Sequence, residues 1–280
     1  MSGDVLSNMT EIENPELRAY TLHRRFDRIG RLIGDAAMEK LYRSHVMILG
    51  VGGVGSFATE SIARSGVGRI TIVDFDDVCI TNSNRQLHAM TGQIGNKKVA
   101  VMAERLKRIN PQATITAVEK FYNAENSEEI LAHQPNIILD CIDNLSAKCH
   151  LLATCVARGI PIITAGGASA KEDPLQIKFV DLSETCIDPF LLQVRRILRQ
   201  KHGFPSEGKM GIPTVFSTEH HTAPLDLAYD NGQGFKCVCP QGQNDFHSCD
   251  NRNMIYGSAS YVTGAFGLVM ASRAIQMLKS

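Results

Sequence analysis

Four glycines and an aspartate are the first residues in the chain whose types and spacing could do chemistry. The apolar run VMIL (46–49) is followed at once by Gly50, Gly52, Gly53 and Gly55. Glycines there let the backbone turn tightly and approach a phosphate group, and a helix that begins behind them offers free N–H groups. Asp74 ends the next apolar run, where a carboxylate can accept hydrogen bonds from ribose hydroxyls. The pattern predicts a nucleotide-binding site rather than a purely structural turn.

Basic residues near these glycines indicate what is done with the nucleotide. An NAD-dependent oxidoreductase would carry the same glycines and the same acid. When the α-phosphorus of a nucleoside triphosphate is attacked, negative charge develops on the departing pyrophosphate, and fixed Arg and Lys donors stabilise it together with magnesium. A dehydrogenase has no such need for Arg28, Arg85 and Lys98 together. Taken singly, each has an ordinary alternative, such as a charge on a solvated surface.

Ordered motifs behind the glycines narrow the class of enzyme. They are DFDDVCITNSNRQ (74–86), GNKKVAVMAERLKRINP (95–111) and DCIDN (140–144). In order and spacing this set resembles the ATP-binding domain shared by ubiquitin-activating enzymes and the molybdopterin- and thiamine-synthesis adenylyltransferases. The resemblance covers roughly residues 20–185 and implies that ATP is used to adenylate a carboxylate.

The resemblance implies roles for the residues that follow the second apolar run. Asp74 would hold the ribose, with Asp76 beside it in the nucleotide site. Asn82, Arg85 and Gln86 match an Asn-x-x-Arg-Gln element, in which the Asn and the Arg reach the ATP phosphates.

Three further residues complete the implied site. Lys98 matches a Lys that contacts phosphate and ribose, and Asp143 matches an Asp associated with magnesium. Asp143 could instead cap the helix predicted behind it. Arg28 lies in RRFDRIGRLIG (24–34), which resembles an Arg-aromatic-x-Arg element whose Arg reaches the partner subunit's ATP site as an arginine finger. The resemblance therefore implies a homodimer.

The second half of the chain carries a sharper resemblance. The segments 164–185, 188–200, 208–219 and 257–275 resemble the tRNA threonylcarbamoyladenosine dehydratase branch of the same superfamily. That resemblance implies that the threonylcarbamoyl carboxylate, in the anticodon loop of tRNA, attacks ATP to give an acyl-adenylate and pyrophosphate. The ureido group of the modification would then close a ring and expel AMP. An intramolecular nucleophile needs no catalytic cysteine, because proximity accelerates closure strongly.

Cysteine spacing bears on the alternative within this superfamily. The eight cysteines include no Cys-x-x-Cys pair, so the four-thiolate zinc site of members that activate ubiquitin-like proteins is not expected. The candidates for a reactive thiol are Cys186, Cys237, Cys239 and Cys249; with His247, the last three could gather a metal, although Cys-x-Cys spacing is awkward for one ion. The alternative function is an adenylyltransferase that activates the C-terminal glycine of a small ubiquitin-like sulfur carrier. A third hypothesis is a non-catalytic scaffold that binds ATP and a cysteine-desulfurase partner, against which the retained cationic residues argue.

A basic helix face is the candidate surface for tRNA. Lys plus Arg and Asp plus Glu both number 29, so no global field attracts nucleic acid and any contact must be local. The residues expected to hold phosphates at the mouth of the site are Arg195, Arg196, Arg199 and Lys209. An ordinary solvated helix face is the alternative. The sequence assigns no role to residues 221–253, and it leaves open a monovalent cation and a sulfur-acceptor partner.

The elements that must position these residues alternate between strand and helix, which predicts an α/β fold with a parallel sheet. Strands are expected at 46–49, 70–73, 114–118, 136–142, 160–167 and 176–182, and helices at 56–65, 97–108, 127–132, 147–158 and 188–200. We expect a Rossmann-like, mostly parallel sheet flanked by helices, with a C-terminal extension of strands, long loops and helices. Residues 202–253 are expected to be long connections around the active site.

Domain organisation and location follow from the termini. Residues 1–20 are expected to be a flexible polar leader, and they lack the apolar core of a signal peptide, which favours a cytoplasmic protein with reduced thiols. Residues 21–280 are expected to form one adenylating domain, with an ATP-binding core (21–185) and a substrate-side extension (186–280). The apolar stretch 256–278 contains serines, a threonine and an arginine, so a buried or dimer-facing helix is favoured over a membrane span.

Overall fold

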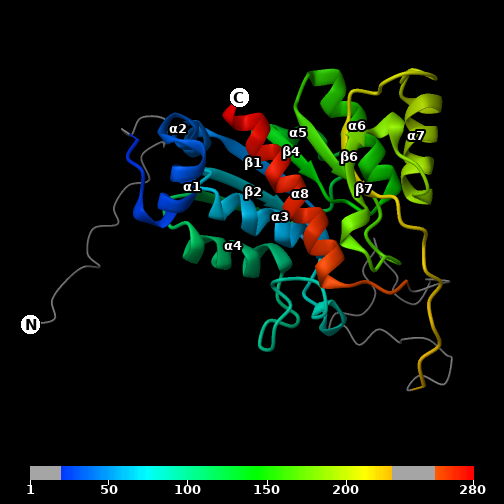
Figure 1. Ribbon diagram of the computed structural model, residues 1–280, viewed down its shortest axis with the longest axis horizontal. Coiled ribbons are helices and arrows are strands. Elements are labelled where there is room, and N and C mark those ends of the chain that lie inside the picture. Colours follow the sequence, from blue (N-terminus) through cyan, green and yellow to red (C-terminus); the bar gives the residue numbers. More distant parts are fainter. Residues whose placement is uncertain (1–19, 229–255) are drawn as a thin grey trace, which may run out of the picture.

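The computed structural model describes residues 20–228 and 256–280, in which seven strands form one sheet with helices on both faces (Figure 1). The strands lie in the order β3-β2-β1-β4-β5-β7-β6. Every neighbouring pair is parallel except β6 and β7, which are antiparallel. The predicted α/β class with a mostly parallel, Rossmann-like sheet is confirmed.

From residue 45 to residue 201 the elements agree closely with the predicted ranges, whereas the two helices before residue 45 were not predicted. The strands are β1 (His45–Leu49), β2 (Arg69–Val73), β3 (Thr114–Val118), β4 (Ile137–Asp140), β5 (Ile162–Ala165), β6 (Ile177–Asp181) and β7 (Pro213–Ser217). The α-helices are α1 (Asp27–Ile33), α2 (Asp35–Arg43), α3 (Gly53–Arg64), α4 (Lys98–Ile109), α5 (Ser127–Leu131), α6 (Leu145–Arg158), α7 (Pro189–Lys201) and α8 (Ser260–Lys279).

Helices cover both faces of the sheet, so its central strands are apolar along their whole length. All five residues of β1 are buried. Val46 and Ile48 lie in one core with side chains of α2, α3, α4 and α8, whereas Met47 and Leu49 lie in the other with side chains of α5, α6 and α7. The alternation follows from the two-residue period of a strand.

One edge of the sheet collects the ends of the strands that precede the predicted motifs. Leu49 of β1 is paired with Val73 of β2 and with Asp140 of β4, all in parallel register. The loops that follow these three strands therefore leave the sheet side by side. The connections diverge on either side of β1, and in open α/β sheets ligands bind in the crevice at such a point.

Strand β7 corrects the interpretation of residues 202–253 as long connections. That prediction is wrong for Pro213–Ser217, which pair with β5 on one side and β6 on the other. Residues 214–217 are all buried. The strand is short and has polar residues at both ends, so it shows neither an apolar run nor an alternating pattern that a sequence analysis could detect.

Helix α8 confirms the buried helix predicted for the apolar stretch near the C-terminus. It crosses one face of the molecule against α3 (Figure 1). The approach is close, since a Cβ at Gly267 would lie 2.4 Å from Val54 O. Within the described ranges, no helix combines the length and the apolar character that a membrane span requires.

Candidate nucleotide-binding site

The loop between β1 and α3 is compact enough that two of its glycines admit no side chain. Gly50 has a φ of +87°, and a Cβ there would lie 2.7 Å from Cys141 O on the neighbouring loop. A Cβ at Gly55 would lie 1.8 Å from Gly50 O. Gly52 differs, because the nearest atom to a Cβ there would be Gln86 Nε2 at 3.8 Å. Gly52 therefore has open space on the side that a Cβ would occupy.

Asp74 ties the second strand to this loop. Its Oδ2 accepts a hydrogen bond from Val51 N at 2.6 Å, and its Oδ1 accepts one from Asp76 N at 2.9 Å. The side chain is buried, and burial raises the pKa of Asp74 while the Lys98 ammonium acts in the opposite direction. The carboxylate predicted to hold ribose thus also fixes the backbone of the glycine loop.

Lys98 is the buried cation of the site. It stands at the start of α4 with 6% of its surface exposed, and its Nζ donates to Asp76 Oδ2 at 2.8 Å. Burial alone would lower the pKa of Lys98, but the carboxylates of Asp74 and Asp76 keep it above its ordinary value. The ammonium is therefore charged at neutral pH and held beside the glycine loop.

The Asn-x-x-Arg-Gln element lies on the loop behind β2. Asn82 is buried, and its Oδ1 accepts from Cys79 N at 3.2 Å. Arg85 is half-buried, and its guanidinium donates to Thr81 O at 2.8 Å. Gln86 is 8% exposed, and among the described residues its Oε1 has no hydrogen-bond partner. The amide of Gln86 faces Gly52, so this buried polar group borders the open side of the loop.

Asp143 lies on the turn after β4 and is exposed. The alternative that it caps the next helix is wrong, because Asn144 is the cap and accepts from Ala147 N at 3.0 Å. Asp143 is one of the carboxylates that raise the pKa of Lys98, so it faces the same site. An exposed carboxylate at this place fits a magnesium ion, which is usually held by one or two carboxylates plus substrate phosphates.

A buried ion pair supports the turn that carries Asp143. Lys148 and Asp140 are both fully buried, and Lys148 Nζ lies 2.6 Å from Asp140 Oδ2. Thr164 Oγ1 donates to the same oxygen at 2.6 Å, and Asp140 Oδ1 accepts from Ile142 N at 3.1 Å. This group was not predicted from the sequence. An Asp at the end of an apolar strand was its one visible signal.

Arg28 lies far from the glycine loop of its own chain. It is exposed on α1, which packs against α2, and Lys40 of α2 donates to Ser280 O at 2.9 Å, at the C-terminal end of α8. The other end of α8 lies at the loop, where a Cβ at Gly53 would lie 3.1 Å from Thr263 Cγ2. A helix of 20 residues separates the two ends by about 30 Å.

The basic residues on and behind α7 have different surroundings. The helix begins at the carboxyl edge of the sheet, where its cap Asp188 accepts from Gly167 N at 2.9 Å, and it runs toward the amino edge, where β7 starts. Arg195 is half-buried and donates to Thr185 Oγ1, whereas Arg196 is exposed. Arg199 Nε donates to Pro205 O at 3.2 Å, and Lys209 Nζ lies 4.0 Å from Glu184 Oε1. Arg199 and Lys209 thus lie away from the glycine loop rather than at its mouth.

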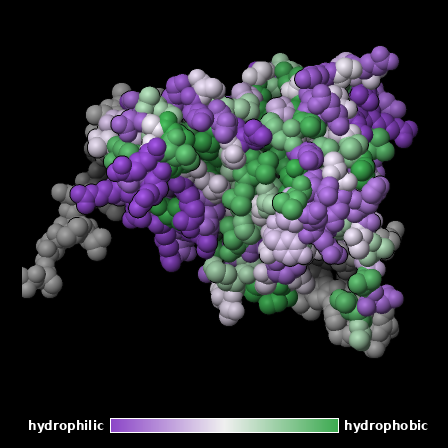
Figure 2. Space-filling model, in the orientation of Figure 1, coloured by the Kyte–Doolittle hydropathy of each residue, from purple (hydrophilic) through white to green (hydrophobic). Residues whose placement is uncertain are grey.

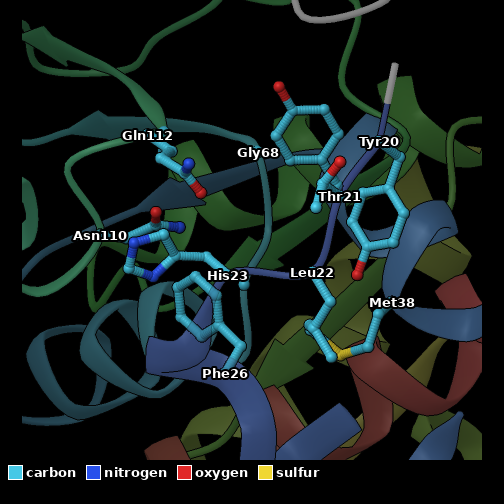
Figure 3. A pocket seen from close by; sticks show the side chains of 12 residues that line it. Tyr20, Thr21, Leu22, His23, Phe26, Met38, Gly68, Asn110 and Gln112 are labelled. Atoms are coloured by element: carbon cyan, nitrogen blue, oxygen red, sulfur yellow. The ribbon is translucent and has the colours of Figure 1, made fainter. Parts of the chain in front are cut away.

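A separate cavity at the amino edge has no features of a phosphate site (Figure 3). Its wall includes Leu22, Phe26 and Met38 together with Tyr20 and Asn110, and no Arg or Lys of the described chain lines it.

The cysteines differ in burial. Cys79, Cys149 and Cys155 are buried, and burial raises the pKa of the Cys155 thiol to about 12. Cys186 is exposed. Cys237, Cys239, His247 and Cys249 lie outside the described residues. In the described part of the chain, no group of three or more metal-ligating side chains is gathered.

Comparison with known proteins decides the family. The model of the ThiF family matches residues 26–280. The chain belongs to the ThiF family. This ThiF-family chain is 38% identical over 274 residues to the tRNA threonylcarbamoyladenosine dehydratase of Haemophilus influenzae, and the match covers 96% of each chain.

Two solved structures extend the comparison to bound nucleotides. The E. coli tRNA N6-threonylcarbamoyladenosine dehydratase, TcdA, in complex with ATP matches with a TM-score of 0.78 and 35% identity, over 91% of this chain and 93% of that one. The complex of the same protein with AMP matches with a TM-score of 0.79 and 36% identity, over 91% and 94%. Because the matches cover nine-tenths of this ThiF-family chain, they span its second half as well as the glycine loop.

Proposed function

We propose that this chain is an ATP-dependent dehydratase that acts on threonylcarbamoyladenosine in tRNA. The threonylcarbamoyl carboxylate attacks the α-phosphorus of ATP and releases pyrophosphate. The ureido group of the same modification then attacks the activated carbonyl and expels AMP, with the net loss of one water. The observation that carries the proposal is the similarity over nearly the whole chain to dehydratases, joined to an open glycine loop with a buried cation beside it.

The residues around the glycine loop bind different parts of the ATP molecule. Backbone N–H groups at Gly52 and the start of α3 receive phosphate oxygens, since the N-terminus of a helix attracts anions. Lys98 and Arg85 stabilise the charge on the departing pyrophosphate, an effect worth roughly 3–4 kcal/mol for a single well-placed donor. Asp74, with Asp76, receives the ribose, and Gln86 and Asn82 line the phosphate side.

The proposed reaction uses a magnesium ion, for which Asp143 is the proposed ligand. When bound, the ion would neutralise phosphate charge and polarise the α-phosphorus. This chain would hold it with the exposed Asp143 carboxylate, which the buried Lys148 and Asp140 pair keeps in place. A monovalent cation stays a prediction without an assigned residue.

A homodimer is the proposed assembly, because Arg28 can serve an ATP site only in another subunit. The apolar side chains exposed on α8 support a contact between copies: Tyr261, Leu268 and Met277 are 59%, 52% and 40% exposed. Figure 2 shows apolar surface gathered across the middle of this face. Sedimentation of the purified protein tests this assembly. We expect a dimer for the unmodified protein and a monomer for Leu268→Glu.

The basic residues on and behind α7 are proposed to bind tRNA phosphates; they are Arg195, Arg196, Arg199 and Lys209. Residues 21–280 are proposed to act as one adenylating domain. Residues 21–185 would form its ATP-binding core and 186–280 its substrate-side extension. A cytoplasmic location is part of the same proposal, since the substrate is tRNA. A sulfur-transfer partner stays a prediction to which no residue is assigned.

The test is chemical. The protein is incubated with ATP, magnesium and tRNA that carries threonylcarbamoyladenosine, and the digested nucleosides are weighed. Loss of one water from the modified adenosine is the expected result. An unchanged nucleoside, with pyrophosphate exchange that depends on a small ubiquitin-like protein, would establish the alternative adenylyltransferase, for which the exposed Cys186 is the first residue to replace.

A further inference from the structure

A second group of polar residues lies at the carboxyl edge, next to the nucleotide site. It surrounds the loop 166–173, which follows β5. Glu219, just after β7, accepts hydrogen bonds from Glu172 N at 2.8 Å and Asp173 N at 2.9 Å. Asp188 accepts from Gly167 N, and Lys171 Nζ donates to Gly167 O at 2.7 Å. None of these residues takes part in the adenylation step described above.

His221 is fixed at the solvent side of this group. Its neighbour Thr222 donates from N to Ala170 O at 2.9 Å, and Ala170 N donates to Gly257 O at 2.8 Å. The His221 ring meets the Tyr256 ring edge-on, with the ring centroids 5.8 Å apart. The imidazole therefore sits between the 166–173 loop and the segment that leads into α8, and it is exposed.

The same segment connects His221 to the nucleotide site. Asn84 Nδ2 donates to Ser258 O at 2.7 Å, and Asn84 directly precedes Arg85. Thr263, at the start of α8, packs on Gly53 of the glycine loop. His221 and the phosphate-binding residues thus lie on two sides of one short stretch of chain, at the edge where an acyl-adenylate would form.

Backbone strain marks the same place. Among the described residues other than glycine, three have positive φ values, and two of them are Ala170 at +61° and Ile187 at +66°. Ala170 contacts the His221 segment, and Ile187 precedes Asp188. Non-glycine residues persist in this conformation only where their surroundings fix it, and they cluster at functional sites.

Three other titratable groups in this cluster, Asp188, Glu219 and Lys171, are already engaged in hydrogen bonds. Asp188 is 2% exposed, and its two oxygens accept from backbone N–H groups of Gly167, Phe190 and Leu191. Both oxygens of Glu219 are bonded to backbone as well. Lys171 is 2% exposed and its ammonium lies against carbonyl oxygen. The His221 ring nitrogens, by contrast, make no hydrogen bond with any residue that the structure describes, so they are available to a substrate.

The charges that face His221 favour its neutral form. Burial lowers the pKa of His221, and the Lys171 ammonium lowers it further, against an opposing contribution from Asp188. Tyr256 faces the ring from the segment before α8, and Glu219 and His220 stand beside it on its own segment. A neutral imidazole is the form that accepts a proton.

We propose that His221 is the general base for ring closure, a role that rests on the proposed dehydratase function. As the ureido nitrogen attacks the activated carbonyl, its proton passes to the imidazole. The new C–N bond forms, the bond from the carbonyl carbon to the phosphate-bound oxygen breaks, and its electron pair leaves with AMP. The imidazolium then returns the proton to water.

The experiment separates the two half-reactions. Pyrophosphate release and dehydrated nucleoside are followed in parallel, with ATP, magnesium and tRNA that carries threonylcarbamoyladenosine. In His221→Gln, pyrophosphate release in the first turnover stays within about 2-fold of the unmodified protein, and ring closure falls about 100-fold or more, the range for loss of a general base. The matched control is His220→Gln, an adjacent exposed histidine, which keeps both rates.

The pH profile gives an independent readout. Ring closure in the unmodified protein falls as pH drops through the pKa of His221, which lies below the ordinary value. Lys171→Gln removes the facing cation, raises the pKa of His221 and moves this fall to higher pH. Ring closure by His221→Gln at the unmodified rate would overturn the proposal and leave the dehydratase function intact. If the unmodified protein forms neither pyrophosphate nor dehydrated nucleoside, the proposed function itself fails.

Discussion

The proposed nucleotide side and the proposed tRNA side of this molecule hold their charges in opposite ways. Around the glycine loop, Asp74 and Lys98 are 9% and 6% exposed, and each is bonded to a neighbouring group. Along α7, Arg196 is exposed, and Lys209 reaches only a carboxylate oxygen 4.0 Å away. A small ligand with fixed charges is bound well by groups that are already desolvated and oriented. A long polyanion is bound by exposed cations that release counterions.

The largest effect should come from glycines that look equivalent in the sequence. Gly55→Ala would drive a Cβ into Gly50 O, so we expect loss of folded protein. Gly52→Ala meets nothing closer than 3.8 Å, so the protein should fold with an unchanged Tm, but the methyl group fills the phosphate approach. We expect ATP to bind about 10-fold or more weakly, which corresponds to ~1.4 kcal/mol. Calorimetry with ATP and thermal unfolding measure the two outcomes; tight ATP binding by Gly52→Ala would contradict the site.

A variant of the half-buried Arg85 tests whether its guanidinium takes part in the reaction. Arg85→Ala should lower pyrophosphate formation roughly 100- to 1000-fold, as for removal of one transition-state donor, with little change in Tm. Arg108→Ala removes a guanidinium that pairs with Glu104 on the outside of α4 and should leave the rate unchanged. Equal rates for the two variants would mean that Arg85 is a surface charge.

Breaking the buried ion pair of Lys148 and Asp140, which supports the turn with Asp143, should lower the stability of the protein. Lys148→Met leaves the Asp140 carboxylate buried without its cation, and removing one partner of a buried pair typically destabilises by about 3–5 kcal/mol. For a chain of this size that corresponds to a fall in Tm of roughly 6–20 °C. The double variant Asp140→Asn with Lys148→Met should recover part of the loss. A Tm unchanged in Lys148→Met would show that the pair is not structural.

The smallest effects are expected on the tRNA side. Arg196→Gln and Arg199→Gln together should weaken tRNA binding several-fold at low salt. The slope of log affinity against log salt should fall by about 2, because each arginine that is replaced leaves one phosphate without its cation. ATP affinity should not change. Filter binding over a salt series measures the slope, and a slope equal to that of the unmodified protein would place the tRNA elsewhere.

The nucleotide side could be predicted from the sequence because its motifs are local. The glycines and Asp74 follow short apolar strands, and parallel strands bring such ends to one edge, whereas Lys98 begins the next helix. The remaining parts depend on contacts between distant segments. Strand β7 is recognisable only once β5 and β6 flank it. The hydrogen bonds that Glu219 accepts from Glu172 N and Asp173 N join two loops, and no sequence pattern links these loops.

Two further features were missed for related reasons. Helices α1 and α2 are short, and of their residues only Gly30, Met38 and Leu41 are buried; Met38 and Leu41 lie in the same core as side chains of α8. Lys148 lies on a helix and Asp140 at the end of a strand, so their residue types alone gave no reason to pair them. In contrast, the helix at 188–200 was predicted correctly, because Leu191, Val194 and Leu198, which α7 buries, recur with a helical period within one segment.

The transfer of heavy oxygen from substrate to nucleotide tests the central claim most directly. The claim is that a carboxylate displaces pyrophosphate from ATP held at Gly52, with Lys98 and Arg85 around it. The threonylcarbamoyl carboxylate of the tRNA is labelled with heavy oxygen, and the nucleotides are analysed by mass spectrometry after one turnover. We expect one labelled oxygen in AMP and none in pyrophosphate. Label in orthophosphate alongside ADP, or unlabelled AMP, would contradict the account.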